Sequence, residues 1–112
     1  MREVISNVVV SYQIRPEVLA EHLALIKGVF DELGDTGPEN VEYKVLRLDD
    51  GVSFLHVSTA TTPDGSNPLP ELASFQRFAK DLAQRVATPP SPTDAQIVGS
   101  YVPSQGALGS NG

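Results

Sequence analysis

The sequence predicts an α+β domain whose elements follow the order β-α-β-β-α-β. Two runs of alternating apolar and polar residues meet at Asp50-Gly51, a dipeptide that strongly indicates a tight β-hairpin. A segment with helical periodicity lies on each side of this hairpin, and a further strand-like run lies beyond each helical segment. This order is typical of a ferredoxin-like fold, in which a four-stranded antiparallel sheet carries two helices on one face.

The first predicted strand, Val4–Ile14, is apolar on both faces around residues 8–10, which is typical of a central strand. By the two-residue period of a strand, Tyr12 shares one face with Val8 and Val10.

The first helix is predicted to begin at Pro16, because proline suits the first helical position, and to end at Gly34. Its apolar face repeats at intervals of four and three residues. We interpret His22 as a residue at the boundary of this face. The face consists of Leu19, Leu23, Ile26, Phe30 and Leu33.

The second half of the chain supplies the hairpin, the second helix and the last strand. The predicted hairpin strands are Val41–Leu48 and Val52–Thr59, and a polar loop follows at 61–68. The second helix is predicted over Pro70–Ala87, where the prolines that follow end it. A short alternating run, Ala95–Val102, is predicted as the fourth strand.

Length and composition indicate one domain. We predict that this domain covers residues 1–103 and that 104–112, which are small, polar and without periodicity, form a flexible tail. No apolar run reaches the length of a membrane span, and the N-terminus shows no apolar run after a basic start. We therefore expect a cytoplasmic protein.

Charge and residue usage exclude several partners. There are 14 acidic and 8 basic residues, and the cations are scattered, so nucleic acid and anionic membrane are disfavoured. The absence of cysteine excludes disulfides, thiolate nucleophiles and Cys-ligated metals. The two histidines stand far apart and form no H-x-x-x-H motif, so we expect no metal, and no cofactor is indicated.

Both helices are expected on one face of the sheet, which leaves the other face bare. The strands carry apolar residues on both faces, and exposing such side chains costs about 1.5–3 kcal/mol each relative to burial. An exposed patch of this kind usually marks an interface. We predict a homodimer in which two sheets close on each other about a two-fold axis. A monomer covered by its proline-rich segment and tail is the alternative.

The chain also resembles a known family. The Arg15-Pro16-Glu17 helix start, the Asp50-Gly51 hairpin, and the segment NPLPEL at 67–72 leading into Phe75 look like the dimeric α/β-barrel superfamily, and within it the small antibiotic-biosynthesis-monooxygenase-like domains. The likeness covers about residues 4–102 and consists mostly of element order and apolar pattern. It implies a pocket between sheet and helices in each protomer.

The superfamily includes cofactor-independent oxygenases, haem-degrading enzymes, haem-dependent enzymes and domains without known activity. Its haem-degrading members resemble this chain less, because they use an Asn, a Trp and a His, and this chain has no Trp. No catalytic residue of the family is transferred to this sequence.

The candidates for a ligand pocket are polar-tipped or aromatic residues on the strands. A histidine in a buried strand needs a hydrogen-bond partner, which either a ligand or a neighbouring Tyr, Ser or backbone group supplies. A tyrosine hydroxyl inside a barrel either donates to a phenolate or carbonyl or lies at a wet edge. The candidates are His56, Tyr12, Tyr43, Phe54 and Tyr101.

Two functions remain open. The first is a dimeric domain that binds a small ligand in a barrel pocket without a recognisable catalytic set. The alternative is a cofactor-independent monooxygenase-like enzyme that acts on a small aromatic compound, with His56 and one or more tyrosines as donors to a developing oxyanion. Haem binding through an axial His56 is a third, easily tested option.

Overall fold

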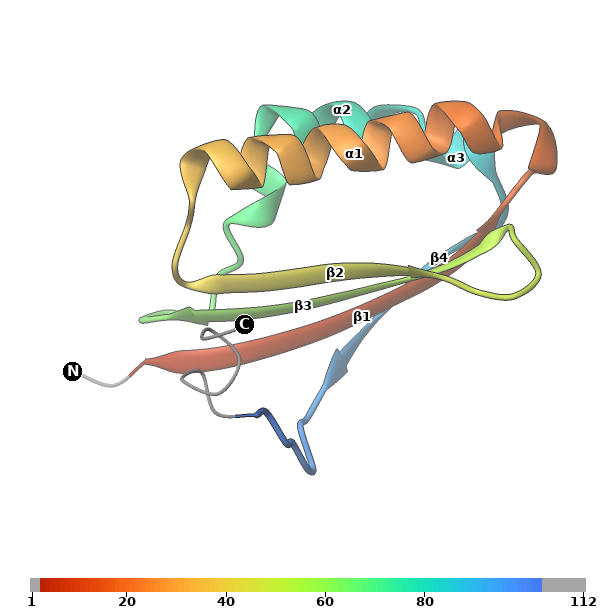
Figure 1. Ribbon diagram of the computed structural model, residues 1–112. Coiled ribbons are helices and arrows are strands. Elements are labelled where there is room, and N and C mark those ends of the chain that lie inside the picture. Colours follow the sequence, from red (N-terminus) through yellow and green to blue (C-terminus); the bar gives the residue numbers. More distant parts are fainter. Residues whose placement is uncertain (1–2, 104–112) are drawn as a thin grey trace.

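The structure, a computed structural model, describes residues 3–103, so the predicted flexible tail at 104–112 lies outside the described residues. A four-stranded antiparallel sheet carries the helices on one face, as predicted (Figure 1). The elements are β1 (Val4–Ile14), a 3-10 turn η1 (Pro16–Val18), α1 (Leu19–Thr36), β2 (Val41–Arg47), β3 (Ser53–Thr62), a 3-10 turn η2 (Leu69–Glu71), α2 (Ala73–Lys80), α3 (Leu82–Arg85) and β4 (Val86–Ala95).

The strand order is β2-β3-β1-β4, so β1 and β3 are the central strands. This confirms the prediction of Val4–Ile14 as a central strand. All three pairings are antiparallel, and in the β1–β3 register Tyr12 pairs with Phe54 and Val10 pairs with His56. Even-numbered residues of both central strands therefore face the helices.

The hairpin between β2 and β3 turns at Asp50-Gly51, as predicted. Gly51 adopts a φ of 80°, which glycine reaches without steric cost. The Asp50 carboxylate accepts backbone N–H bonds from Val52 at 3.0 Å and from Ser53 at 2.8 Å. These bonds fix the turn and with it the register that aligns Tyr43 with Ser58.

The hydrophobic core lies between the sheet and the helices. Its buried members come from β1, β3, α1 and α2, and three of them are aromatic. The fully or nearly buried core residues are Tyr12, Ile14, Val29, Phe54 and Phe78.

The first helix differs from prediction at its C-terminal end. It runs through Gly34 to Thr36, and Gly37 caps it with a φ of 58° and an N–H bond to the Leu33 carbonyl at 2.8 Å. Gly37 provides the left-handed C-cap, and Pro38 directly after it cannot continue the helix. Gly34 stays helical because the following residues, Asp35 and Thr36, tolerate a last turn.

The second helix is interrupted, and it ends earlier than predicted. After η2, Leu72 is extended, α2 begins at Ala73, and Asp81 separates α2 from the short α3. The predicted helix to Ala87 is therefore wrong by its last residues, since the chain is extended from Val86.

The prediction of the fourth strand at Ala95–Val102 is wrong. β4 occupies Val86–Ala95, and in residues 96–103 the structure describes no strand. The strand contains three prolines, which an edge strand tolerates because its outward positions need no N–H. Two of them, Pro89 and Pro90, fall where the register with β1 shifts between Ser11 and Gln13.

The face of the sheet away from the helices has no helix over it in Figure 1. Large apolar side chains on it are exposed, Ile5 to 62% and Leu46 to 45%, and Val9, Leu55 and Val57 beside them are half-buried. In the part of the chain that the structure describes, no helix is long and apolar enough to cross a membrane.

Candidate functional site

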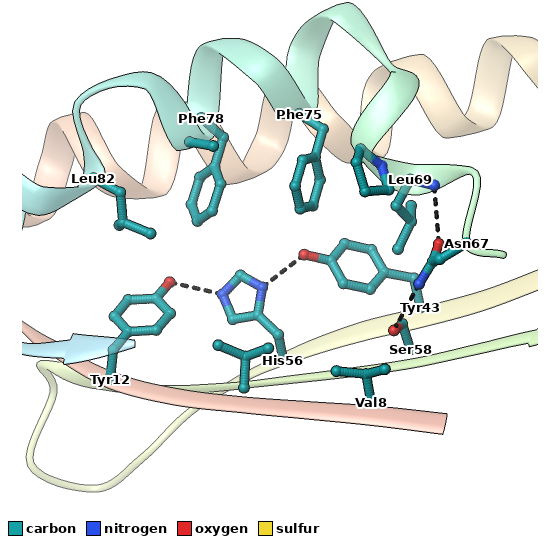
Figure 2. A pocket seen from close by; sticks show the side chains of 13 residues that line it. Val8, Tyr12, Tyr43, His56, Ser58, Asn67, Leu69, Phe75, Phe78 and Leu82 are labelled. Carbon is teal, nitrogen blue, oxygen red and sulfur yellow. Dashed lines mark hydrogen bonds between the residues drawn. The ribbon is translucent and has the colours of Figure 1, made fainter. Parts of the chain in front are cut away.

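A cavity of about 180 Å³ lies between the sheet and the second helical region. Figure 2 shows Phe75, Phe78 and Leu82 pointing from the helices toward the sheet, where His56 stands at the centre of the floor. Most of the lining is apolar. The polar groups in it are Tyr12, Tyr43, His56, Ser58 and Asn67.

His56 lies on β3 at a position whose side chain points inward, and it is buried. Its Nε2 is 2.7 Å from the Tyr12 hydroxyl oxygen, and its Nδ1 is 2.6 Å from the Tyr43 hydroxyl oxygen (Figure 2). The two tyrosines come from the strands on either side of β3. The buried histidine therefore has two tyrosine partners, as in the interpretation of a core histidine satisfied by neighbouring tyrosines, and it also borders the cavity.

The Tyr12 hydroxyl continues the network into the core. It lies 2.7 Å from His22 Nε2 on α1, and the Arg85 Nε donates to His22 Nδ1 at 3.1 Å. Arg85 also donates to the Phe78 carbonyl oxygen and lies over the Phe78 ring, 5.4 Å from its centroid. We call this series the hydrogen-bonded line. Its members, in order, are Arg85, His22, Tyr12, His56 and Tyr43.

The histidines of the line are neutral at pH 7. Burial lowers the pKa of His22 to about 4, and the charge of Arg85 adds to this effect. Burial likewise lowers the pKa of His56 to about 4, with a smaller contribution from His22. Burial raises the pKa of Tyr12 and of Tyr43 well above the ordinary tyrosine value, so both phenols are also neutral.

A second set of hydrogen bonds holds the loop over one end of the cavity. The Asn67 amide donates to the Ser58 hydroxyl oxygen at 3.2 Å, and its carbonyl oxygen accepts the Leu69 N–H at 2.9 Å (Figure 2). Asn67 thus joins β3 to the turn η2 that opens the second helical region. This contact sets how closely Leu69 approaches the floor of the cavity.

Of the five predicted pocket residues, Tyr12, Tyr43 and His56 lie together at the cavity. Phe54 is buried in the core, stacked on Tyr12 with ring centroids 5.7 Å apart, and does not line the cavity. Tyr101 is 88% exposed and lies beyond β4, because the chain has no strand where the fourth one was expected.

Two residues of the line were not predicted. The interpretation of His22 as a boundary residue is wrong, since it is fully buried. The signal was present, because His22 falls three residues after Leu19 and four before Ile26, and so continues a helical face as well as Leu23 does. Arg85 also continues a helical face, because it follows Leu82 by three residues. A charged residue at such a position is nevertheless expected to be exposed, so the sequence did not indicate its burial.

The arrangement bears on metal and haem chemistry. Among residues 3–103 no group of three or more His, Cys, Asp or Glu side chains could hold a metal ion. Both ring nitrogens of each histidine already take part in hydrogen bonds, so an axial bond to haem would require one of these to break. The site brings the hydrogen-bonding groups of His56, Tyr12 and Tyr43 to the floor of a mostly apolar cavity.

No family model matches the sequence. No curated protein matches it either. Solved structures do match. Three of them are provisionally named as antibiotic biosynthesis monooxygenases, from Bacteriodes thetaiotaomicron, Caulobacter crescentus and Nitrosomonas europaea.

The match with the Bacteriodes protein has a TM-score of 0.74 at 12% identity and covers 90% of this chain and 96% of that one. The match with the Caulobacter protein has a TM-score of 0.70 at 13% identity and covers 87% of this chain and 92% of that one. The match with the Nitrosomonas protein has a TM-score of 0.69 at 12% identity and covers 88% of this chain and 94% of that one. At such identities the likeness concerns the fold. The matches confirm that this chain has the ferredoxin-like α+β fold of antibiotic-biosynthesis-monooxygenase-like domains, which is the resemblance that the sequence indicated.

Proposed function

We propose that this protein binds a small aromatic molecule that carries a hydroxyl or carbonyl oxygen, in the cavity between its sheet and its second helical region. The observation that supports this most directly is the pairing of His56 with Tyr12 and Tyr43 at the floor of a mostly apolar cavity. An apolar pocket with a few converging polar groups is the usual form of a small-molecule site.

The size of the cavity limits the ligand. A protein cavity of about 150 Å³ is known to accommodate benzene, and the volume here is about 180 Å³. A single aromatic ring with a few small substituents fits this volume. Phe75 and Phe78 would pack against such a ring, while the Tyr43 hydroxyl would contact its oxygen substituent.

Thermal denaturation with a panel of phenols, hydroquinones and benzoquinones tests this function. A ligand that binds the native state raises the melting temperature, and above Kd the shift grows with the logarithm of the ligand concentration. We expect Leu82→Trp, which would fill the cavity, to abolish the shift, and Tyr101→Phe, a tyrosine change outside the cavity, to leave it intact. A panel without any concentration-dependent shift would refute the proposal.

We propose cofactor-independent oxygenation of a small hydroquinone as the second candidate. It is supported by the names of the proteins that share this fold and by a mostly apolar cavity with donors for a phenolate. In this reaction the hydroquinone and O₂ give a hydroxyquinone and water. One oxygen atom enters the ring in place of a hydrogen, and the other leaves as water.

Oxygen consumption with a hydroquinone panel separates the enzyme from the binding protein. The enzyme should consume O₂ above the buffer rate and yield a hydroxyquinone, and His56→Ala should lower the rate by about 10²-fold or more if its hydrogen bond stabilises the oxyanion. Tyr101→Phe is the matched control. Ligand binding without O₂ consumption would leave only the first candidate.

We also propose that the protein is a homodimer through the face of the sheet that no helix covers. The support is the apolar content of that face, including Ile5, Leu46 and Leu55. Light scattering should give a particle of twice 12.0 kDa at micromolar concentration. A particle of 12.0 kDa would exclude the dimer.

A further inference from the structure

The hydrogen-bonded line joins five elements of the chain. Arg85 comes from α3, His22 from α1, and the remaining three members from adjacent strands. Its four links measure 3.1, 2.7, 2.7 and 2.6 Å, from Arg85 to Tyr43. One end is a guanidinium that is only 3% exposed, and the other end is a phenol that borders the cavity.

The charged end fixes the direction of the first two links. A guanidinium carries only donors, so Arg85 Nε–H must donate to His22 Nδ1. A neutral His22 then holds its proton on Nε2 and donates it to the Tyr12 hydroxyl oxygen. Tyr12 is left with its own hydroxyl hydrogen to place.

The line contains one more hydrogen than it has links. The Arg85 Nε–H, one proton on each neutral histidine and one on each tyrosine serve four hydrogen bonds. If Tyr12 donates to His56 Nε2, then His56 donates from Nδ1 to Tyr43, and the spare hydrogen belongs to Tyr43. In the opposite order Tyr12 accepts twice, and its own hydrogen is left in the core. Since Tyr12 is the more buried of the two, the first order is favoured.

The charge of Arg85 has no anionic partner at close range. Within residues 3–103, no carboxylate lies at ion-pair distance from its guanidinium. Burial lowers the pKa of Arg85, and the more distant carboxylates of Glu21 and Asp81 oppose that effect. A buried cation without a paired anion favours negative charge elsewhere in the same low-dielectric region.

We infer that every hydrogen bond of the line is donated in the direction from Arg85 to Tyr43. The Tyr43 hydroxyl hydrogen then points into the cavity and is donated to an anionic oxygen of the ligand. The pocket would therefore select acidic phenols, bound as phenolates, over neutral aromatic molecules of the same shape. Arg85, His22 and Tyr12 are then positioning residues that act through His56 on Tyr43. This inference rests on the proposed function, since it names the class of aromatic ligand.

Para-nitrophenol and nitrobenzene make a matched pair of probes, because they differ by one acidic hydroxyl and only the phenolate absorbs visible light. At a pH slightly below the solution pKa of para-nitrophenol, we expect the bound form to show the phenolate spectrum. We also expect the wild-type protein to bind it at least about tenfold more tightly than nitrobenzene, the factor that a hydrogen bond to a charged group supplies.

Tyr43→Phe and Arg85→Met should reduce this preference to near unity and abolish the phenolate spectrum, while both variants still bind nitrobenzene. Arg85→Lys, which keeps a charge and a donor, should retain most of the preference. The exposed residues Arg77 and Tyr101 supply the controls Arg77→Met and Tyr101→Phe, which should change nothing. Retained nitrobenzene binding shows that a variant is folded.

The outcomes separate the inference from the proposed function. Equal affinities for the two probes, or a colourless bound para-nitrophenol, would overturn the inference and leave aromatic binding in place. A preference lost in Tyr12→Phe but kept in Tyr43→Phe would overturn the direction assigned to the line. Binding of neither probe would overturn the proposed function and this inference with it.

Discussion

The two faces of the sheet treat polar and apolar side chains in opposite ways. On the face toward the helices, polar groups are buried, and each member of the hydrogen-bonded line has a partner. On the other face, apolar groups such as Ile5 and Leu46 are exposed. The side chains of the inner face are buried by the helices of the same chain, whereas no helix within residues 3–103 covers the apolar side chains of the outer face. Substitutions on the inner face should therefore affect stability and binding, and those on the outer face should affect association.

The largest loss of stability is expected from the inner core. Phe54→Ala removes a ring that is buried to 98% and stacked on Tyr12, so the free energy of unfolding should fall by about 3–5 kcal/mol. Urea denaturation monitored by circular dichroism measures the loss. A decrease of less than about 1 kcal/mol would mean that the inner face is packed more loosely than the structure shows.

Acid should weaken the inner face next. The pKa of His22 and of His56 is lowered to about 4 in the folded protein from 6.5, so the unfolded chain binds protons more readily. The part of the stability that depends on these two histidines being neutral is fully present above pH 6.5, and it is lost as the pH falls toward 4. Urea midpoints measured across this range should decline, and His56→Gln should flatten the decline by roughly half. An unchanged slope in that variant would contradict the burial of a neutral His56.

Removing one hydroxyl from the line should have a smaller effect. Tyr43→Phe leaves His56 Nδ1 without its partner at 2.6 Å and should lower the free energy of unfolding by about 1 kcal/mol. Tyr101→Phe, on an exposed side chain, should change it by less than about 0.5 kcal/mol. Parallel thermal melts compare the two. Equal effects would show that the inner network adds nothing to stability.

The smallest effect on the folding of one protomer is expected on the outer face. Leu46→Lys places a charge where the side chain is already 45% exposed, so the stability of a protomer should change by less than about 0.5 kcal/mol. If the proposed dimer forms there, this substitution should shift it to monomer. Sedimentation equilibrium checks this, and Glu42→Lys, on the same strand face, separates lost apolar contact from added charge.

Sequence patterns predicted the fold where local chemistry and tertiary packing agree. Asp50-Gly51 determines its own turn, and Val8 to Val10 identify β1 as central because no other position suits such a run. The apolar face predicted for the first helix included Leu23 and Phe30, which the structure leaves more than one third exposed. The buried positions are His22 and Val29, because a histidine with two hydrogen-bond partners fits the core.

The site was predicted in part for the same reason. Tyr12, Tyr43 and His56 were candidates because they are polar-tipped residues on predicted strands, but the sequence did not indicate which face of each strand lines the cavity. Arg85 was not predicted, since the single sequence gives no sign that His22 and the Phe78 carbonyl would accept its hydrogen bonds. Tyr101 was placed on a strand because the prolines of β4 were interpreted as a helix stop and not as part of an edge.

The prolines of β4 have a consequence for self-association. An outermost strand normally presents free N–H groups that recruit another strand and start aggregation. Pro89, Pro90 and Pro92 cannot donate, so this border of the sheet is protected against open-ended growth. The β4 edges of two molecules therefore pair poorly with each other, and fibril formation that begins at this edge is suppressed.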